Sequence, residues 1–406
     1  MPNDATLDFI RCHAEDDVRK LALTQAPKGV DLRLALIQIE GRKLTAHKLP
    51  TWSQTEGILF PPRLSLEQCS SEATAAYKRA IVSRLIGCSC LSSTSFIDLT
   101  AGFGVDFVAL APLFSHAVFV DRQAELCELA HHNFPLFGLN KVDIRCSYAE
   151  DVLNSYSQQP TADEPPFTVL MIDPARRDAV GRKVALIEDC TPDVCALQDQ
   201  LRSLARYVVV KLSPMLDLTS ALRSLRGAIE AHVVGADGEC KELLIILAKE
   251  HEAIPIDQIP IHVGDSLLFT RAEEAAAQSV FASRLGTYLY EPNASILKAG
   301  AFRTIGLRYS LEKLAPQTHL YTSDHLVTDF PGRIWCIAAS TTFAKRELRE
   351  FLRDVPAADL TLRGFPSSVT ALRQQLHIRE GGNVHLLATT LANNQRLLLR
   401  LAPPHI

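Results

Sequence analysis

The chain has 406 residues, of which 47% are hydrophobic and 22% are charged, and its formal net charge is -4. This composition excludes an intrinsically disordered protein, and the length suggests two or three globular domains. A protein that is basic all over is also excluded, whereas a local basic patch for nucleic acid is neither indicated nor excluded by the charge.

The sequence indicates a cytoplasmic protein that has no membrane partner. It does not begin with a basic segment followed by an apolar one, and it contains no uncharged apolar run of roughly 18 residues. Its ten cysteines are scattered and lack the paired spacing of a zinc site. We therefore expect reduced, mostly buried thiols and no bound metal.

Residues 1–72 are predicted to form a mainly helical segment. The stretches LDFIRCH and DDVRKLAL place apolar side chains at helical spacing. At the end of the segment, Ser70 and Ser71 stand directly before Glu72. Hydroxyl caps followed by an acid in the first turn predict the start of a helix there.

Residues 73–250 alternate between apolar strands and helices. Strands are predicted at residues 96–100, 116–121, 143–148, 168–173, 207–212, 231–237 and 242–248. The helices between them include one with Thr191 as its cap and Pro192 at its first position. This alternation predicts an α/β fold, a Rossmann-like doubly wound sheet with helices on both faces. The short connection between the last two strands predicts an antiparallel hairpin at one edge.

Beyond residue 251 the alternation is less regular. Strands are predicted at residues 332–340, 358–365, 383–390 and 395–402, with helices at 344–355 and 367–376. This pattern indicates a separate α+β domain that ends in a hairpin.

Two acids and two glycines follow the first strands of the predicted sheet. Gly102 and Gly104 allow a tight turn and a close approach of the backbone to a ligand, and Asp98 stands at the end of the strand before them. Asp121 ends the next strand, where a carboxylate can accept both hydroxyls of a ribose. The third glycine of a dinucleotide-binding loop is replaced by Phe107, which disfavours a nicotinamide cofactor. A structural alternative is a tight turn with Asp121 as a helix cap.

These residues carry a resemblance to a known class of enzymes. DLTAGFGVD (98–106), VFVDR (118–122), and Asn133 with Gly138 resemble class I S-adenosylmethionine-dependent methyltransferases, especially those that modify ribosomal or transfer RNA. The resemblance implies S-adenosylmethionine as cofactor, with the first acid and the glycines at its methionine part and Asp121 at its ribose. The residues that we expect to bind this cofactor are Gln68, Asp98, Thr100, Gly102, Gly104, Asp121 and Tyr148.

Tyr148 is one of three candidates for the adenine contact after the third strand, since CSYAEDV also offers Glu150 and Asp151. Gln68 lies in a segment that resembles the part of these enzymes that covers the cofactor. Ser71, in the same segment, is explained equally well by a plain helix cap.

The whole chain resembles a bacterial family that joins a methyltransferase domain to a ferredoxin-like segment and a C-terminal THUMP-like domain. The matching segments are residues 64–78, DPARR, VVVKLSPMLD, and residues 290–300, 318–324 and 362–366. The resemblance implies a helical segment at 1–72, a methyltransferase domain at 73–250, a ferredoxin-like segment at 251–317 and a THUMP-like domain at 318–406.

THUMP domains bind structured RNA, so the resemblance also implies an RNA partner. The alternative is a module that only packs or dimerises. The positions where RNA contacts are expected are Tyr290, Asn293, Lys298, Arg363 and residues 364–366.

The motif IDPARRD (172–178) is expected at the substrate end of the site. Enzymes that methylate exocyclic amines usually have an Asp or Asn, two prolines and an aromatic ring at this point, because the acid accepts from the amine and the ring stacks on the base. Here Asp173 keeps the acceptor, but Ala175 and Arg176 replace proline and ring. Arg176 or Tyr207 is left as a stacking group.

The motif also resembles that of 5-methyluridine RNA methyltransferases, which need a cysteine nucleophile after the fifth strand. Residues 211–214 are Lys-Leu-Ser-Pro, so we expect direct transfer to nitrogen or oxygen. Four basic residues and one acid give residues 176–183 a net charge of +3, which suits phosphate contacts with RNA. The alternative is that Arg176 pairs with Glu188 or Asp189 and that the other cations are solvated.

The predicted catalytic residues are Asp173, Arg176 and Lys211, and an ion pair of Lys211 with Asp173 or Asp217 is the competing interpretation. The leading hypothesis is an S-adenosylmethionine-dependent methyltransferase that modifies a base nitrogen of tRNA or rRNA. The alternatives are methylation of a small molecule or protein, and a non-catalytic RNA-binding protein that retains the fold.

Overall fold

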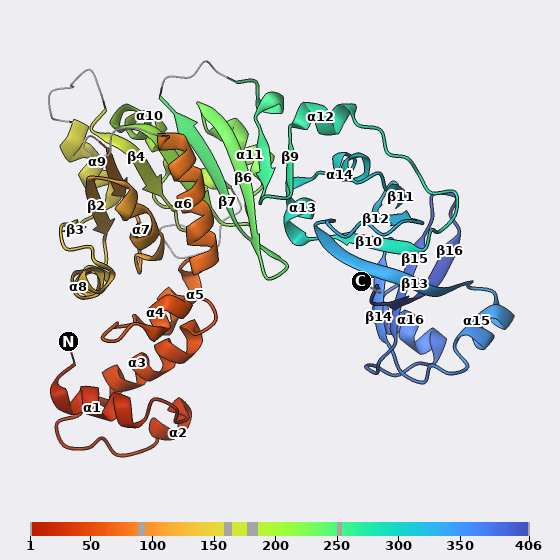
Figure 1. The fold of residues 1–406 in the computed structure, drawn as a ribbon, viewed down its shortest axis with the longest axis horizontal. Coiled ribbons are helices and arrows are strands. Elements are labelled where there is room, and N and C mark those ends of the chain that lie inside the picture. Colours follow the sequence, from red (N-terminus) through yellow and green to blue (C-terminus); the bar gives the residue numbers. More distant parts are fainter. Residues whose placement is uncertain (1, 88–93, 158–164, 177–185, 250–253, 405–406) are drawn as a thin grey trace. The chain divides into compact units, whose positions relative to one another are not determined.

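The computed structural model describes residues 2–87, 94–157, 165–176, 186–249 and 254–404 (Figure 1). The chain divides into two compact units. The first consists of Met1–Ala231 and Glu242–Ile254, and the second of His232–Lys241 and Pro255–Ile406. The finer division predicted above, with borders at residues 72, 250 and 317, stays a prediction.

The first unit opens with helices, as the sequence predicts. They are α1 (Asp4–Cys12), α2 (Val18–Leu21), α3 (Leu32–Thr45), α4 (Pro50–Gln54), α5 (Arg63–Gln68) and α6 (Glu72–Ile86). The predicted start of α6 is confirmed, because Ser71 is its N-cap and forms a capping box with Thr74.

The helical segment packs against the first turn of the α/β part. Trp52 contacts the ring of Phe103 at 4.6 Å between ring centroids, and both belong to one buried apolar cluster with Leu49. Asn133, at the end of α8 (Ala124–Asn133), accepts from the amide of Leu59 at 3.0 Å and donates to its carbonyl at 2.8 Å. The N-terminal segment is therefore part of the same folded unit as the sheet.

The sheet of the first unit has the strand order β3-β2-β1-β4-β5-β7-β6. Its strands are β1 (Ser95–Asp98), β2 (His116–Asp121), β3 (Asp143–Cys146), β4 (Phe167–Ile172), β5 (Ala205–Leu212), β6 (Ala228–Ala236) and β7 (Glu239–Ala248). The first five are parallel where they pair, and β7 runs antiparallel to β5. The predicted doubly wound sheet is confirmed.

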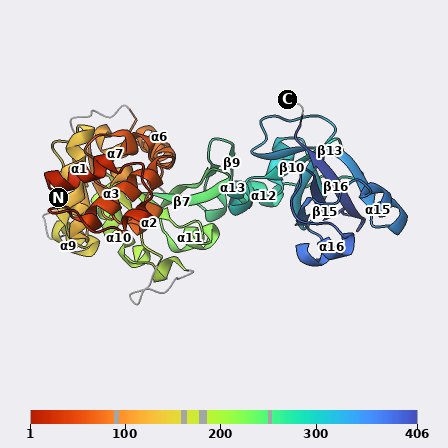
Figure 2. The same cartoon turned by 90° about the horizontal axis from the view of Figure 1, so that it is seen from below.

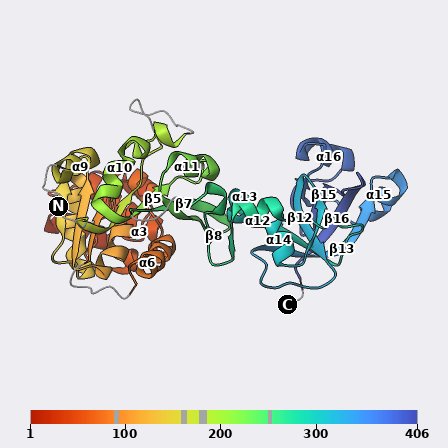
Figure 3. The same ribbon diagram turned by 90° about the horizontal axis from the view of Figure 1, so that it is seen from above.

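Helices cover both faces of this sheet. The crossover helices are α7 (Val105–Leu110), α8, α9 (Ala149–Ser157), α10 (Val194–Leu204) and α11 (Leu218–Ser224). In Figures 2 and 3, α9, α10 and α11 lie on one side of the strands, whereas α6 lies on the other. Short 3-10 helices follow α7 at Ala111–Leu113 and α8 at Phe134–Phe137, and another precedes α10 at Ile187–Asp189.

The predicted cap of α10 is wrong. The helix begins at Val194, and its N-cap is Asp193, whose side chain accepts from the amide of Ala196 at 3.0 Å. Thr191 instead pairs its backbone with Ala175, through hydrogen bonds of 2.8 and 3.0 Å. Its position in this short bridge keeps Thr191 out of the helix, so the carboxylate two residues later takes the capping role.

The second unit holds a seven-stranded sheet in the order β11-β12-β10-β13-β16-β15-β14. Its strands are β10 (Tyr288–Pro292), β11 (Glu312–Ala315), β12 (Thr318–Ser323), β13 (Gly332–Thr342), β14 (Asp359–Arg363), β15 (His385–Thr390) and β16 (Arg396–Ala402). Its helices are α12 (Arg271–Ala276), α13 (Ala294–Ala299), α14 (Thr304–Arg308), α15 (Lys345–Phe351) and α16 (Val369–Leu376). The predicted α+β domain that ends in a hairpin is confirmed, because β15 and β16 pair antiparallel.

Residues His232–Lys241, which include the end of β6 and the start of β7, belong to the second unit. There β6 is followed in the sheet by β8 (Ile261–Val263) and β9 (Leu267–Phe269). A 3-10 turn at Ile256–Gln258 precedes β8.

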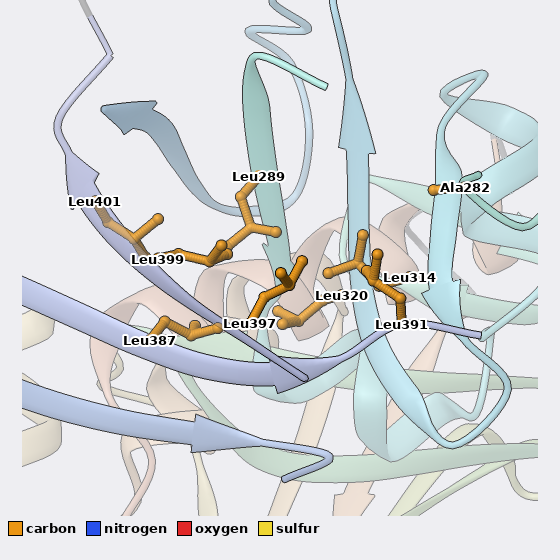
Figure 4. Close-up of a cluster of buried hydrophobic side chains, with 9 residues drawn as sticks. All are labelled: Ala282, Leu289, Leu314, Leu320, Leu387, Leu391, Leu397, Leu399 and Leu401. Carbon is orange, nitrogen blue, oxygen red and sulfur yellow. The ribbon is translucent and has the colours of Figure 1, made fainter. Parts of the chain in front are cut away.

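The seven-stranded sheet buries apolar side chains on both faces. On β16, Leu397, Leu399 and Leu401 belong to one core cluster, together with Leu289 and Leu320 (Figure 4). Leu398, between them in sequence, belongs to a second cluster that also contains residues of α16. Because neighbouring residues of a strand point to opposite faces, both faces of this sheet are covered.

Throughout the described ranges, the model contains no helix of the length and apolar character that a membrane span requires.

Candidate functional site

The carboxyl ends of four parallel strands meet at one edge of the first unit's sheet. Asp98 ends β1, Asp121 ends β2, Asp173 directly follows β4, and Lys211 is the penultimate residue of β5. In an open parallel sheet, ligands bind at this edge, near the point where the strand order reverses. Here the order reverses between β1 and β4. The structure therefore brings the predicted site residues of four separate segments to one edge.

Asp98 is a buried carboxyl group, with only 2% of its surface exposed. Its side chain accepts from the amide of Thr100 at 3.0 Å. Burial raises the pKa of Asp98 to about 8, because removal from water penalises the charged form. A cation placed beside this carboxyl group would favour its ionised form and bind to it strongly.

The loop after β1 is fastened to the end of β2 through Asp121. One oxygen of Asp121 accepts from the amide of Gly102 at 2.9 Å, and the other accepts from the amide of Gln123 at 2.8 Å. The carboxylate thus fixes the glycine loop, and both of its oxygens keep further lone pairs for a ligand.

The two glycines of this loop have different surroundings. Both have a positive φ, +59° at Gly102 and +88° at Gly104. A Cβ at Gly104 would lie 2.8 Å from the ring of Phe134, whereas a Cβ at Gly102 would meet nothing within 4 Å. Gly104 therefore serves packing, and Gly102 faces open space where a ligand can approach.

Thr100 links Asp98, at the expected methyl-donor end of the site, to Asp173, at the expected substrate end. Its hydroxyl accepts from the amide of Asp173 at 2.6 Å, while its own amide donates to Asp98. The side chain of Asp173 is 34% exposed and pairs with Lys211, with 2.7 Å between Oδ2 and Nζ. The ion pair of Lys211 with Asp173 is thus observed, whereas Asp217 caps α11.

Lys211 is held as a cation by carboxylates on two sides. Its Nζ also lies 3.2 Å from Oδ2 of Asp106, in the first turn of α7. Burial lowers the pKa of Lys211, but Asp173 and Asp106 overcome this and raise it well above its ordinary value. Lys211 therefore stays protonated and cannot act as a general base.

The other predicted residues are more exposed. Gln68 is exposed at the end of α5, and Tyr148 is exposed between β3 and α9. Arg176 is half-buried after the bridge residue Ala175. Glu188, one of its suggested partners, accepts instead from the hydroxyl of Ser224.

Tyr207 is not a stacking platform for the substrate. It lies near the start of β5, four residues before Lys211, which at strand spacing is about 13 Å from the site. Its ring contacts the guanidinium of Arg206 instead. The cations at positions 177, 182 and 183 lie outside the described residues.

Sequence reasoning missed Ser70, Lys78, Asp106 and Glu242, which surround Lys211 or its partners. Lys78 resembles an ordinary helix-surface residue, yet only 1% of it is exposed. The available signal was position, because Ser70 and Lys78 belong to the segment 64–78 that carries the family resemblance.

The residues present fit S-adenosylmethionine. The buried carboxyl of Asp98 suits the ammonium of its methionine part, open space beside Gly102 admits a ligand, and Asp121 presents a carboxylate for ribose hydroxyls. When bound, the cofactor supplies an electrophilic methyl group on a sulfonium. Asp98, Gly102 and Asp121 are the residues that would hold the cofactor.

The strand order, the antiparallel β7 and the acids at the ends of β1 and β2 define a class I methyltransferase. The chain is 33% identical to a "putative methyltransferase" from Porphyromonas gingivalis W83 of known crystal structure. The match covers 99% of this chain and 98% of that one, with a TM-score of 0.82. This chain belongs to the same family.

Two family models match the second unit. Residues 288–331 match a ferredoxin-like domain, and residues 332–401 match a domain described as THUMP domain-like. Both domains are those that the sequence resemblance implies, and this recognition is confirmed.

Curated relatives agree with the assignment. Uncharacterized S-adenosylmethionine-dependent methyltransferases of two Mycobacterium tuberculosis strains, CDC 1551 / Oshkosh and ATCC 25618 / H37Rv, are each 27% identical to the chain over 286 residues. These residues are 70% of this chain and 73% of each relative. The chain is thus a methyltransferase, and S-adenosylmethionine is its methyl donor.

Proposed function

We propose that this enzyme methylates a base nitrogen of transfer or ribosomal RNA, in the cytoplasm, by direct transfer of the methyl group. The observation that carries this proposal is the combination of a methyl-donor site with a THUMP domain-like region in one chain. THUMP domains bind structured RNA, so the second unit supplies a reason for an RNA substrate that the site alone does not.

Asp173 is the proposed acceptor for the N–H of the target base. Its backbone is fixed by the hydroxyl of Thr100, and its carboxylate is fixed by Lys211. A carboxylate oriented on both sides can accept a hydrogen bond from a base nitrogen and hold the nitrogen lone pair in line for the transfer. Arg176, which follows in the same motif, is proposed to contact the RNA.

The thiols near the site do not favour a covalent route. Methylation at carbon 5 of uracil needs a thiolate nucleophile. Cys190 lies within electrostatic range of Asp173, but burial raises the pKa of its thiol to about 11. Cys69 lies within range of Lys211, and burial raises the pKa of its thiol as well. Neither thiol is activated, which supports direct transfer.

A comparison of modified nucleosides in total RNA, from cells with and without the gene, tests this proposal. We expect one methylated nucleoside to be lost when the gene is absent. RNA from the deletion cells should then accept methyl groups from the purified enzyme and radiolabelled S-adenosylmethionine.

Asp173→Asn should slow this transfer by on the order of 100-fold. Asp199→Asn is the matched control. This exposed carboxylate lies on helix α10, outside the site, and pairs with Arg226 at 2.7 Å. It should leave the rate unchanged.

An unchanged nucleoside profile together with no transfer would reject RNA as the substrate. If the enzyme still binds S-adenosylmethionine in a calorimeter, a small molecule or a protein becomes the substrate class to test. No binding at all would leave only a non-catalytic role.

A further inference from the structure

A line of alternating charges runs from the interior of the first unit to the substrate end of the site. It begins at Glu242 on β7, which pairs with Lys78 on α6. Lys78 Nζ lies 3.1 Å from Oδ1 of Asp106, and Oδ2 of Asp106 lies 3.2 Å from Lys211 Nζ. Lys211 then pairs with Asp173 at 2.7 Å. Five residues from five segments thus form one connected row of acids and bases.

A single hydroxyl group lies at the centre of this row. Ser70 Oγ donates to Oδ2 of Asp106 at 2.7 Å. The same oxygen accepts from Lys78 and from Lys211, each at 3.3 Å. A serine hydroxyl has one donor and two acceptor lone pairs, so Ser70 is fully used and fixes both lysines relative to the same carboxylate.

From Lys78 onward, exposure of the side chains rises along the row toward the substrate. It is 1% for Lys78, 7% for Asp106, 13% for Lys211 and 34% for Asp173. Glu242, behind Lys78, is 7% exposed. Asp173 is therefore the member most accessible to a substrate. The buried Lys78 and Asp106 can act on the reaction only through the groups that they contact.

The buried part of the row is not explained by stability alone. Removing a charge from water is costly, and buried ion pairs are often no more stabilising than apolar residues of the same volume. What such a network provides is a fixed geometry, because each charge accepts only positions close to its partners. The row ends at Asp173, so the fixed positions of the buried charges also fix the position of the Asp173 carboxylate at the site.

We propose that Asp106 and Lys78 are positioning residues, which hold Lys211 as a fixed cation against Asp173 and so orient the Asp173 carboxylate toward the substrate N–H. This inference rests on the proposed function, in which Asp173 accepts from the substrate. It assigns Ser70 to the same task, as the group that joins the two lysines to Asp106.

The charge state of the row supports this role. Burial opposes ionisation of Asp106, but Lys78 and Lys211 lower its pKa to about 2. Asp106 is therefore an anion at any physiological pH. Together with Asp173, which raises the pKa of Lys211 more strongly, this anion keeps the lysine protonated.

Competitive acetylation of lysines tests the first half of the proposal without any substrate. The enzyme is labelled with acetic anhydride at a series of pH values, and the label on Lys211 is measured by peptide mass spectrometry, with exposed Lys141 as internal reference. In Asp106→Asn, the pH at which Lys211 becomes reactive should fall, with about a tenfold rise in labelling at a given pH for each pKa unit lost. Asp143→Asn should behave like the native enzyme, since that carboxylate pairs with Arg145 outside the row.

Methyl transfer to RNA from deletion cells tests the second half. Asp106→Asn should lower kcat on the order of 100-fold, as a misplaced reacting group does, while the affinity for S-adenosylmethionine stays unchanged in a calorimeter. If Asp106 acts through Lys211, the same substitution should cause no further loss in a Lys211→Met background. Ser70→Ala removes one hydroxyl and should give a smaller loss of the same kind, which keeps the test valid if Asp106→Asn does not fold.

Two results would overturn the inference: an identical labelling profile of Lys211 in all variants, or an equal loss of kcat from Asp106→Asn with and without Lys211. If the native enzyme methylates no RNA, the proposed function fails. The labelling profile still decides whether Asp106 holds Lys211 as a cation.

Discussion

The carboxyl group of Asp98 couples cofactor binding to pH. Its pKa of about 8 in the folded protein reflects burial, so below that pH the group is protonated. The ammonium of S-adenosylmethionine favours the ionised form, and binding should therefore release up to one proton between pH 6 and 7, where the carboxyl is otherwise neutral. Calorimetry in buffers of different ionisation enthalpy measures this proton directly. Binding without proton release in that range would contradict the placement of Asp98 at the ammonium.

Asp98→Asn is the matched variant, because it keeps the shape and removes the titration. It should bind S-adenosylmethionine more weakly and release no proton. In the free enzyme the pKa of Asp98 in the folded state lies above its ordinary value of 3.8. The stabilising contribution of neutral Asp98 is therefore fully present below about pH 3.8 and is lost as the pH rises to about 8. The variant should therefore gain stability relative to the native enzyme as the pH rises through that range, as thermal unfolding would show.

The loop between β1 and α7 contains two glycines with different roles: Gly104 is needed for packing, and Gly102 borders the open space where a ligand can bind. Gly104→Ala should lower the free energy of unfolding by about 1–3 kcal/mol or more, because its Cβ meets the ring of Phe134 at 2.8 Å and its φ is positive. Gly102→Ala also has an unfavourable φ, but its Cβ enters open space. It should weaken S-adenosylmethionine binding more than it lowers stability.

Denaturant unfolding and calorimetry on both variants check this contrast. If Gly102→Ala binds the cofactor with native affinity, the open space beside that residue is not where the cofactor lies.

The site residues that lie at the ends of strands could be predicted from the sequence. Asp98 and Asp121 each end a short apolar strand and Asp173 directly follows one, and parallel strands bring such positions to one edge. Lys78 and Asp106 could not be predicted in the same way. Their role depends on how α6 and α7 pack on the sheet, and a lysine in an alanine-rich helix gives no periodic sign that it is buried.

The same limit applies to the fold. The sequence pattern predicts the order of strands and helices because apolar periodicity is local. The cap of α10 was misplaced by two residues because the bridge of Thr191 with Ala175 joins segments that are distant in sequence. Local capping preferences do not record such a contact.

At the scale of the whole molecule, each unit has its own buried core. Leu399 on β16 is fully buried in a cluster that consists of second-unit residues, whereas Leu170 on β4 is fully buried in the first unit. Leu399→Ala should lower the stability of the second unit by about 2–5 kcal/mol, the usual range for a buried leucine, and leave the affinity for S-adenosylmethionine within twofold of native. Leu170→Ala should destabilise the first unit instead.

Unfolding of the full chain, with and without the cofactor, distinguishes the two variants. A ligand stabilises only the part that binds it, so S-adenosylmethionine should shift the transition that Leu170→Ala lowers and not the one that Leu399→Ala lowers. A tenfold loss of cofactor affinity in Leu399→Ala would mean that the donor site depends on the second unit's core. Unchanged affinity with reduced methylation of RNA would instead indicate that the second unit serves the substrate, as the proposed function requires.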